Sequence, residues 1–221
     1  RNRHCHGRAF CGMSFELRLT IYIVALILCG CAYFLWVAYG PVKRFLFRHW
    51  TIRMYYRKVN QVVLDHDFYL INDFKGKTAG AETFHIDHVI IGDKYVYVVR
   101  DRFYDGTLLS NPDDQSWLYC SGSKSRYIQN PLIYNRLRAE RLRLLGPIDS
   151  HIILPVGLVN DDCFYTPFEQ SPELGYFVSL RQFPKFIDRK ESEPIAPIDP
   201  DMAKLLAEDV YSIKMNNRNE P

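Results

Sequence analysis

One aspartate and two arginines lie in adjacent segments that the sequence predicts to form a β-hairpin. Asp87 belongs to the first segment, Arg100 and Arg102 belong to the second, and Gly92-Asp93 between them is typical of a tight two-residue turn. An aspartate carboxylate can help to hold a divalent metal, and it can equally pair with a guanidinium. The hairpin is therefore the segment of this chain most suited to chemistry.

Period-2 alternation assigns the hairpin residues to faces. It places His85, Asp87, Val89 and Ile91 on one face of the first strand, and Val96, Val98, Arg100 and Arg102 on one face of the second. With Gly92-Asp93 as the whole turn, His85 faces Arg100, and Asp87 is diagonal to Arg100 on the same face. A hard cation needs several oxygen ligands and only one carboxylate is evident here. We therefore favour an Asp87–Arg100 ion pair over a metal site.

The rest of the chain predicts the elements that would position this hairpin. Asn130 followed by Pro131 is a typical helix start, and the helix is expected to stop at Gly146-Pro147. The predicted strands are 61–72, 84–91, 94–102, 117–120, 151–160 and 175–180, and a last helix opens at Asp199-Pro200. This order predicts an α/β (α+β) fold with a mixed β-sheet flanked by helices.

Before this domain, residues 19–42 form a stretch without charge. About 20 apolar residues suffice for a helix to cross a bilayer. Residues 43–58 carry six Lys and Arg and no acid, and a basic excess favours the cytoplasmic side. We expect a single-pass membrane protein with a cytoplasmic domain. A cleaved signal peptide and a lipoprotein signal at Leu28-Cys29-Gly30-Cys31 are the alternatives, but the stretch is longer than a usual signal core.

These signals divide the chain into five parts. They are a short extracytoplasmic terminus (1–18), a transmembrane helix (19–42), a basic juxtamembrane segment (43–60), a folded domain (61–190), and a linker with a C-terminal helix (191–221). Residues 19–58 are expected to contact membrane lipid. Because the first residue is Arg1 rather than Met, an incomplete reading frame is one interpretation of the amino terminus.

Charge and cysteine content narrow the function classes. Residues 1–60 hold ten Lys and Arg and one acid, a net charge of +9, whereas residues 61–221 hold eighteen and twenty-four, a net charge of −6. An acidic average is unfavourable for a domain that grips phosphate backbones over a wide surface. Cys120 and Cys163 are the cysteines of the domain and lack zinc-site spacing, which favours a reduced compartment.

Three sequence features together resemble the nuclease-related domain, NERD, of the PD-(D/E)xK nuclease-like superfamily. They are HIDHVIIGDKYVYVVRDRFYDG at 85–106, then Trp117, then QNPLIYNRLRAERLRLLG at 129–146. The resemblance covers roughly residues 55–160, and many members of the family have a nearby transmembrane helix. It implies a restriction-endonuclease-like fold with a mixed sheet.

In active relatives the resemblance implies an Asp on the first strand, Glu-x-Lys on the second and a Gln on the helix, with Mg²⁺ or Mn²⁺ held by the carboxylates. Asp87 matches the Asp and is the only metal ligand kept. Arg100 stands in place of the Glu and Arg102 in place of the Lys. Tyr134 stands where the helix Gln belongs, and His85 where many relatives have Glu. These remnant catalytic positions predict a degenerate site.

We therefore expect a membrane-anchored, non-catalytic binding or scaffold module without a cofactor, whose protein partner the sequence leaves open. The alternative is a Mg²⁺- or Mn²⁺-dependent nuclease rearranged around Asp87, Asp101 and Arg102, which requires a bulge at Asp101. An adaptor unrelated to nucleases is a third possibility. The helix residues Tyr134, Arg136 and Arg138 are the candidates for nucleic-acid binding, although a charge-rich helix is more often a solvated face.

Overall fold

The computed structural model describes residues 15–78, 82–146 and 148–219, with side chains at all of these except 18, 35–36, 38–51 and 216–219. The chain divides into two compact units, Arg1–Ile52 and Arg53–Pro221. Most of the predicted extracytoplasmic terminus lies outside the described residues. The aromatic and basic side chains between 38 and 51, which contribute to the membrane prediction, also lie outside them.

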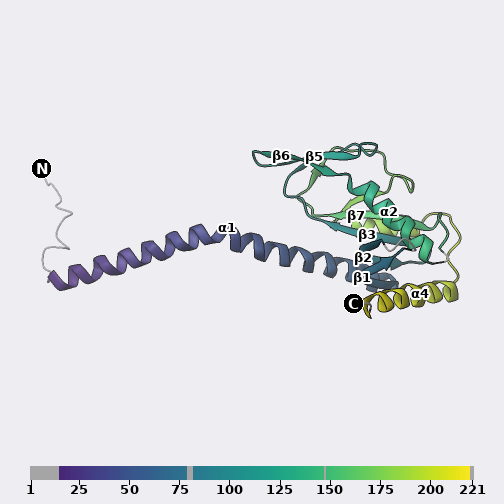
Figure 1. The fold of residues 1–221 in the computed structure, drawn as a ribbon, viewed down its shortest axis with the longest axis horizontal. Helices are drawn as coiled ribbons and strands as arrows, with labels where there is room; N and C mark the ends of the chain where they lie inside the picture. Colours follow the sequence, from purple (N-terminus) through teal and green to yellow (C-terminus); the bar gives the residue numbers. More distant parts are fainter. Residues whose placement is uncertain (1–14, 79–81, 147, 220–221) are drawn as a thin grey trace, which may run out of the picture. The chain divides into compact units, whose positions relative to one another are not determined.

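Along the chain, α1 is followed by the strands β1–β6, then by α2, the strands β7–β9, and the helices α3 and α4 (Figure 1). The helices are α1 (Phe15–His66), α2 (Pro131–Leu145), α3 (Phe183–Glu191) and α4 (Pro200–Asn219). The strands are β1 (Tyr69–Lys77), β2 (Thr83–Ile91), β3 (Val96–Arg102), β4 (Thr107–Leu109), β5 (Ser116–Ser121), β6 (Lys124–Gln129), β7 (Ile153–Val159), β8 (Phe164–Tyr165) and β9 (Tyr176–Ser179). The predicted mixed α/β class is confirmed.

The first unit contains the apolar part of α1. Residues Phe15–Phe34 form a helical stretch with a mean hydropathy of 2.0 whose side chains are not buried within the protein. By length and composition this stretch can cross a membrane, and a signal sequence meets the same criteria.

In the second unit, two sheets carry the fold. The larger has the strand order β1-β2-β3-β7-β9 and the smaller β6-β5-β4-β8. In the larger sheet β1, β2 and β3 pair antiparallel, whereas β3, β7 and β9 pair parallel. Parallel strands need a crossover connection, and the connection from β3 to its parallel neighbour β7 contains α2. The sheet is therefore mixed because a meander precedes a crossover unit.

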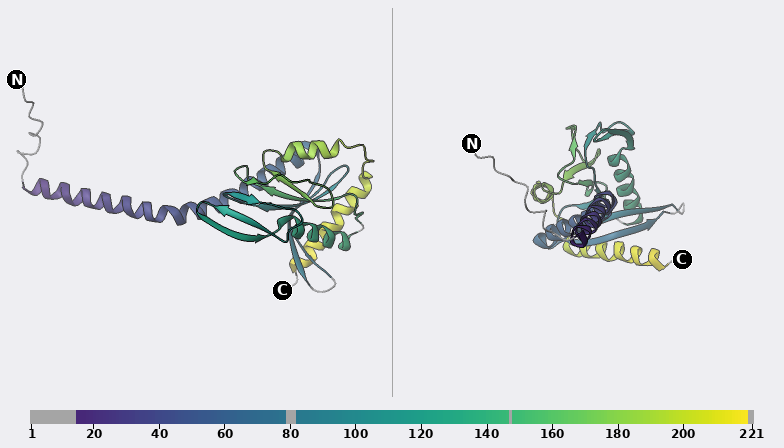
Figure 2. Two further views of the ribbon diagram at one scale, coloured as in Figure 1. Left: turned by 90° about the horizontal axis from the view of Figure 1, so that it is seen from above. Right: turned by 90° about the vertical axis from the view of Figure 1, so that its left-hand side faces the viewer.

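Helices cover both faces of the larger sheet, as the view from above in Figure 2 shows. The end of α1 and helix α3 pack on one face, in a core that includes Val59, Tyr97 and Phe186. Helices α2 and α4 pack on the other, in a core that includes Leu142 and Val210. Burial of both faces explains why β7 is apolar along its whole length.

The prediction of a strand over 61–72 is wrong for its first half, since α1 continues to His66 and β1 begins at Tyr69. Tyr55, Val59, Val62 and Val63 are buried against the sheet, and their i, i+4, i+7 and i+8 spacing is helical. Asp67 then ends the helix in a left-handed conformation with φ of 57°. The adjacent apolar residues Val62 and Val63 suggest a strand only when they are considered without Tyr55 and Val59, which continue the helical spacing.

The predicted register of the β2–β3 hairpin is displaced by two residues. The strands pair Ile91 with Val96 and Val89 with Val98, because the connection comprises residues 92–95 rather than Gly92-Asp93. Tyr95 closes this loop by accepting a hydrogen bond from the Gly92 amide at 2.9 Å. A shift of two preserves the side of the sheet that each residue faces.

A kink in β1 and β2 corrects the predicted face of Asp87. Ile71 and Phe74 of β1 belong to one core, as do Ile86 and Val89 of β2, although residues three apart lie on opposite faces of a regular strand. Each strand therefore gains one residue at the kink. The register is unchanged across it, with Ile71 opposite Val89 and Phe74 opposite Ile86. His85 consequently does not share the face of Val89, and Asp87 lies at the kink itself.

The predicted start of α2 is confirmed. The side chain of Asn130 accepts a hydrogen bond from the Leu132 amide at 2.9 Å, and Pro131 occupies the first helical position. Asn130 is fully buried and also donates to the carbonyls of Pro112 and Asp114 at 2.9 and 2.8 Å. The cap therefore also fastens the loop before β5 to the helix.

Tyrosines in the core predict a loss of stability at alkaline pH. Burial raises the pKa of Tyr55 and Tyr97 well above the ordinary value near 10, and Tyr97 also donates to Glu191. Folding therefore holds protons that the unfolded chain releases above pH ~10. We expect the free energy of unfolding to fall by up to about 1.4 kcal/mol per pH unit for each such tyrosine above that pH. Urea denaturation of the chain and of Tyr97→Phe between pH 8 and pH ~11 measures this, and an equal slope in both would contradict it.

Candidate functional site

The candidate site lies where β2 and β3 separate. Their described pairing ends with His88 opposite Val99. Just beyond, the Asp87 carboxylate accepts a hydrogen bond from the Asp101 amide at 2.8 Å, and its other oxygen accepts from Arg100 Nη1 at 2.8 Å. Asp87 thus bridges the gap between the two strands. Its side chain and that of Arg100 are each 19% exposed, so this predicted ion pair is present and largely desolvated.

His85 extends this contact toward β1. Its Nδ1 lies 2.5 Å from Arg100 Nη1 and its Nε2 lies 2.6 Å from Asp73 Oδ1. A neutral imidazole with its proton on Nε2 satisfies both, because Nε2–H donates to Asp73 while Nδ1 accepts from Arg100. The hydrogen bond from His85 lowers the pKa of Asp73. Asp73 has a φ of 53°, which an aspartate tolerates, and it occupies the kink of β1.

His88 forms a second polar cluster that the sequence did not predict. The ring is fully buried and lies between Asp101, with Nε2 3.0 Å from Oδ2, and the side-chain amide of Asn72, 2.5 Å from Nδ1. Tyr56 of α1 packs edge-on against it. Burial raises the pKa of Asp101, although the hydrogen bond with His88 opposes this. The signal in the sequence that could have indicated this cluster is the presence of a histidine, an asparagine and an aspartate within otherwise apolar strands.

Three arginines gather beside Asp87. Arg100 and Arg102 come from β3, and Arg138 comes from α2, which packs against β3 and β7. Burial and the neighbouring charges of Arg100 and Arg102 lower the pKa of Arg138 to about 10. The Nε atom of Arg100 is buried without a hydrogen-bond partner among the described residues. The arginine cluster (Arg100, Arg102, Arg138) therefore has more positive charge than Asp87 alone compensates.

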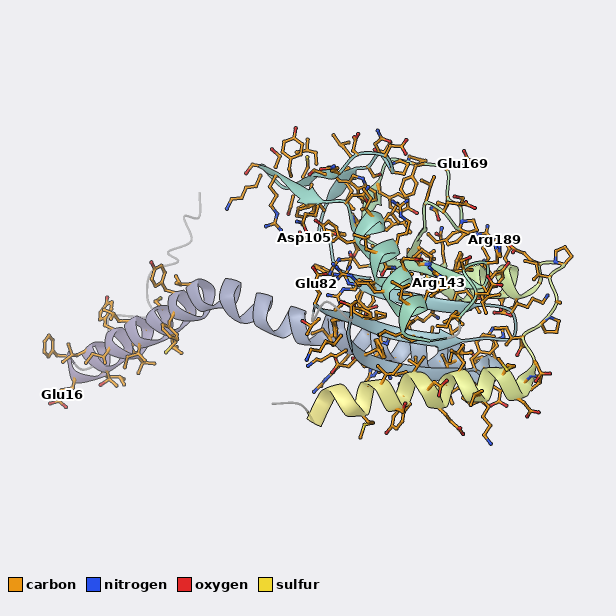
Figure 3. The ribbon with its side chains drawn as sticks, turned by 45° about the vertical axis from the view of Figure 1, so that its right-hand side comes forward. Glu16, Glu82, Asp105, Arg143, Glu169 and Arg189 are labelled. Carbon is orange, nitrogen blue, oxygen red and sulfur yellow. The ribbon has the colours of Figure 1, made fainter. Side chains whose placement is uncertain are left out.

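The other residues of α2 that were predicted to bind nucleic acid, Tyr134 and Arg136, have contacts of their own. Tyr134 is 38% exposed, and its carbonyl accepts from Arg138 Nη1 at 3.0 Å. Arg136 donates to the carbonyl of Glu173 at 3.1 Å. Arg143 pairs with Glu140 on the same helix. Figure 3 labels Arg143 on α2 and Glu82 just before β2. Glu82 forms an ion pair with Arg141 of this helix. The role of Tyr134 and Arg136 in nucleic-acid binding stays a prediction.

The residues present do not fit a two-carboxylate metal site. Within the described part of the chain, no three His, Cys, Asp or Glu side chains are placed to hold one metal ion. Asp87 already has a guanidinium 2.8 Å away, and a fixed cation at that distance opposes a divalent one. Asp101 pairs in register with Leu158 of β7, so β3 has no bulge there, and its carboxylate contacts His88 instead.

Comparison with known proteins identifies the domain. A model of the nuclease-related domain family, NERD, matches residues 52–156. The chain carries a nuclease-related domain. This confirms the resemblance drawn from the hairpin and helix motifs, and it removes the possibility of an adaptor unrelated to nucleases. The matched region contains α1 from residue 52, the whole candidate site and helix α2.

The other comparisons add little to the family. No curated protein matches the chain. The crystal structure of AF1548, a protein of unknown function, is similar over 75% of this chain and 96% of that chain, with 12% sequence identity and a TM-score of 0.32. The nuclease-related domain therefore stands on the family match, and its chemistry must be argued from its own residues.

Proposed function

We propose that this chain is a membrane-tethered, non-catalytic member of the nuclease-related domain family that binds phosphate groups at the former metal site. One observation carries the proposal. Arg100 occupies the position that the family pattern gives to a second carboxylate, and its guanidinium binds Asp87 at 2.8 Å. A fixed positive charge there replaces the charge that a metal ion would bring.

The tether is supported by residues 15–34, which can cross a membrane, and by the six basic residues between 43 and 58. Each Lys or Arg near an anionic membrane surface contributes about 1 kcal/mol of attraction. We infer a cytoplasmic domain from this basic excess. Lipid contact through residues 19–58 follows from the same charge pattern.

Phosphate is the ligand that suits the arginine cluster. A guanidinium group can donate two parallel, charge-assisted hydrogen bonds to two oxygens of one phosphate. Arg102 and Arg138 have no acidic partner among the described side chains. Burial, together with the charges of Arg100 and Arg102, lowers the pKa of Arg138 to about 10. The acidic average of the domain makes this binding local, at one site, rather than spread over a surface.

A cleavage assay tests the non-catalytic part of the proposal. The full chain in detergent is incubated with single- and double-stranded DNA and RNA and with Mg²⁺ or Mn²⁺, beside Asp87→Ala. We expect no cleavage that depends on Asp87. Cleavage that disappears in Asp87→Ala would instead favour the alternative, a metal-dependent nuclease whose site has rearranged around Asp87, Asp101 and Arg102.

A binding assay in EDTA tests the phosphate part. We expect the full chain to bind single-stranded DNA without metal, with log K falling against log salt with a slope near −1.4, as expected for two phosphate contacts at about 0.7 each. Arg102→Ala/Arg138→Ala should weaken binding at least tenfold and flatten the slope. Arg143→Ala is the matched control, since Arg143 lies on the same helix but pairs with Glu140. Equal losses in both variants would show that the cluster is not the site.

A further inference from the structure

A second pocket lies outside the part of the chain that matches the family. It is a cavity of about 600 Å³ between the 165–170 loop, strand β9 and helix α3. Its aromatic lining consists of Tyr165, Phe168, Tyr176, Phe177 and Phe186, and its polar lining includes Gln182, Lys185, Arg189 and Lys190. Figure 3 labels Arg189, which lines the pocket from α3, and Glu169, which belongs to the loop opposite but does not line the pocket. A volume of this size is that of a site for a small molecule.

The loop wall is held in place by the free edge of β9, the last strand of the larger sheet. The side chain of Gln170 donates from Nε2 to the Phe177 carbonyl at 3.2 Å, and its Oε1 accepts from the Phe177 backbone amide at 3.2 Å, in the positions that a neighbouring strand would use. Tyr165 donates to the same carbonyl at 3.2 Å and packs edge-on against the Phe177 ring at 5.1 Å. The aromatic wall is thus preformed, which reduces the entropy lost on binding.

Helix α3 forms the opposite wall of the pocket, and its acidic and basic side chains lie on different sides of the helix. Its acids are engaged elsewhere, Asp188 with His66 at 3.0 Å and Glu191 with Tyr97 at 2.6 Å. Its bases Lys185 and Arg189, one helical turn apart, line the pocket and have no acidic partner among the described side chains. The Arg189 guanidinium lies 5.9 Å from the Phe186 ring centroid. This side of the helix therefore presents two uncompensated cations next to aromatic rings.

The other polar groups of this wall are the start of α3 and the paired side chains of Lys190 and Glu193. The amino terminus of α3 adjoins the pocket at Gln182, and no side chain caps it. A helix amino terminus favours an anion, although Pro184 in this first turn contributes no N–H. Lys190 is buried, with Nζ 4.6 Å from the Tyr176 ring centroid, and is neutralised by Glu193 at 2.7 Å. Glu193 is thus the acid of the lining, and its charge is already paired.

We infer that this pocket binds a small anion that carries a planar aromatic ring, of the nucleoside phosphate class. The ring would stack against the aromatic lining, while Lys185, Arg189 and the start of α3 would hold the phosphate. An aliphatic anion would leave the aromatic wall unused, and a neutral aromatic would leave two cations unpaired. The inference is independent of the arginine cluster, because the two sites share no residue.

Fluorescence titration of the full chain in detergent with methylanthraniloyl-ADP tests the inference. We expect saturable binding that unlabelled ADP reverses. Methylanthraniloyl-adenosine, which has no phosphate, should bind at least tenfold more weakly. Lys185→Ala/Arg189→Ala should weaken binding at least tenfold. Arg181→Ala is the matched control, since Arg181 is exposed just before α3 but does not line the pocket. A 5′-phosphorylated trinucleotide as competitor distinguishes a nucleic-acid end from a free nucleotide as the source of this chemistry.

Three outcomes would overturn the inference. They are no saturable binding up to millimolar ADP, competition by inorganic pyrophosphate as strong as by ADP, and binding that survives in Lys185→Ala/Arg189→Ala. Loss of nucleotide binding in Arg102→Ala/Arg138→Ala instead would place the ligand at the arginine cluster and would also count against it. The DNA-binding assay in EDTA is repeated with Lys185→Ala/Arg189→Ala. If DNA binding persists in this variant, a failure of the pocket proposal can be distinguished from a failure of the proposed function.

Discussion

Carrying Arg100→Glu and Arg102→Lys, the chain is expected to bind Mn²⁺ at least a hundredfold more tightly than the unaltered chain. The first substitution places a carboxylate beside Asp87 in place of a guanidinium 2.8 Å from it. It changes the local charge by two units, and one unit charge at 4 Å contributes about 4 kcal/mol at an effective dielectric constant near 20. Calorimetric titration with MnCl₂ measures the affinity.

Arg100→Gln with Arg102→Lys is the matched control for this gain. It removes the same guanidinium but adds no carboxylate, so we expect it to recover only a small part of the affinity. If the Glu variant folds and still binds no metal, the result would contradict the proposal that Arg100, in place of a glutamate, prevents metal binding. Thermal unfolding of both variants verifies that they fold.

Asp87→Ala is expected to lower the free energy of unfolding by about 3 kcal/mol, the lower end of the range for a buried ion pair, because both side chains of this pair are 19% exposed. The substitution leaves the Arg100 guanidinium largely desolvated without its carboxylate, and it removes the acceptor of the Asp101 amide. His85 cannot compensate, because its Nδ1 accepts from Arg100 without bringing a charge. Urea denaturation of the full chain in detergent measures the loss.

A double-mutant cycle separates the ion pair from the packing around it. Asp87→Ala/Arg100→Met should be less destabilised than Asp87→Ala alone, because the uncompensated cation has also been removed. Glu140→Ala, which breaks the exposed pair with Arg143, should leave stability almost unchanged. Additive effects of the two substitutions at 87 and 100 would mean that the pair does not contribute as a unit.

Local signals were sufficient for much of the fold. The start of α2 follows from Asn130 and Pro131, whose conformational preferences act within one turn, and the structure agrees. Alternation and the Gly92-Asp93 turn place the β2–β3 hairpin, and the apolar run at 151–160 yields β7. The error at 61–66 arose because two adjacent valines suit either a strand or the buried side of a helix, and only contact with the sheet distinguishes the two.

The candidate site divides in the same way. The ion pair between Asp87 and Arg100 was predicted because opposite charges at that diagonal lie within reach, and the family resemblance supplied the meaning of those positions. The contact of His85 with Asp73 was not predictable, because it depends on the kink at residues 73 and 87, where paired insertions cancel in the register. The contacts of His88 with Asn72 and Asp101 depend instead on the pairing of β2 with β1 and β3, which joins separate segments of the chain.

The sequence by itself determined the mixed α/β class, the start of α2, the apolar stretch near the amino terminus, the family, and the presence of Arg100 where the family resemblance implies a carboxylate. These properties depend on residue type and on spacing over a few residues. Only the tertiary structure decided the register of the hairpin, the gathering of Arg138 with Arg100 and Arg102, and the pocket between β9 and α3. Each of these joins segments far apart in the chain, and their placement is set by packing on the two faces of one sheet, which local preferences do not encode.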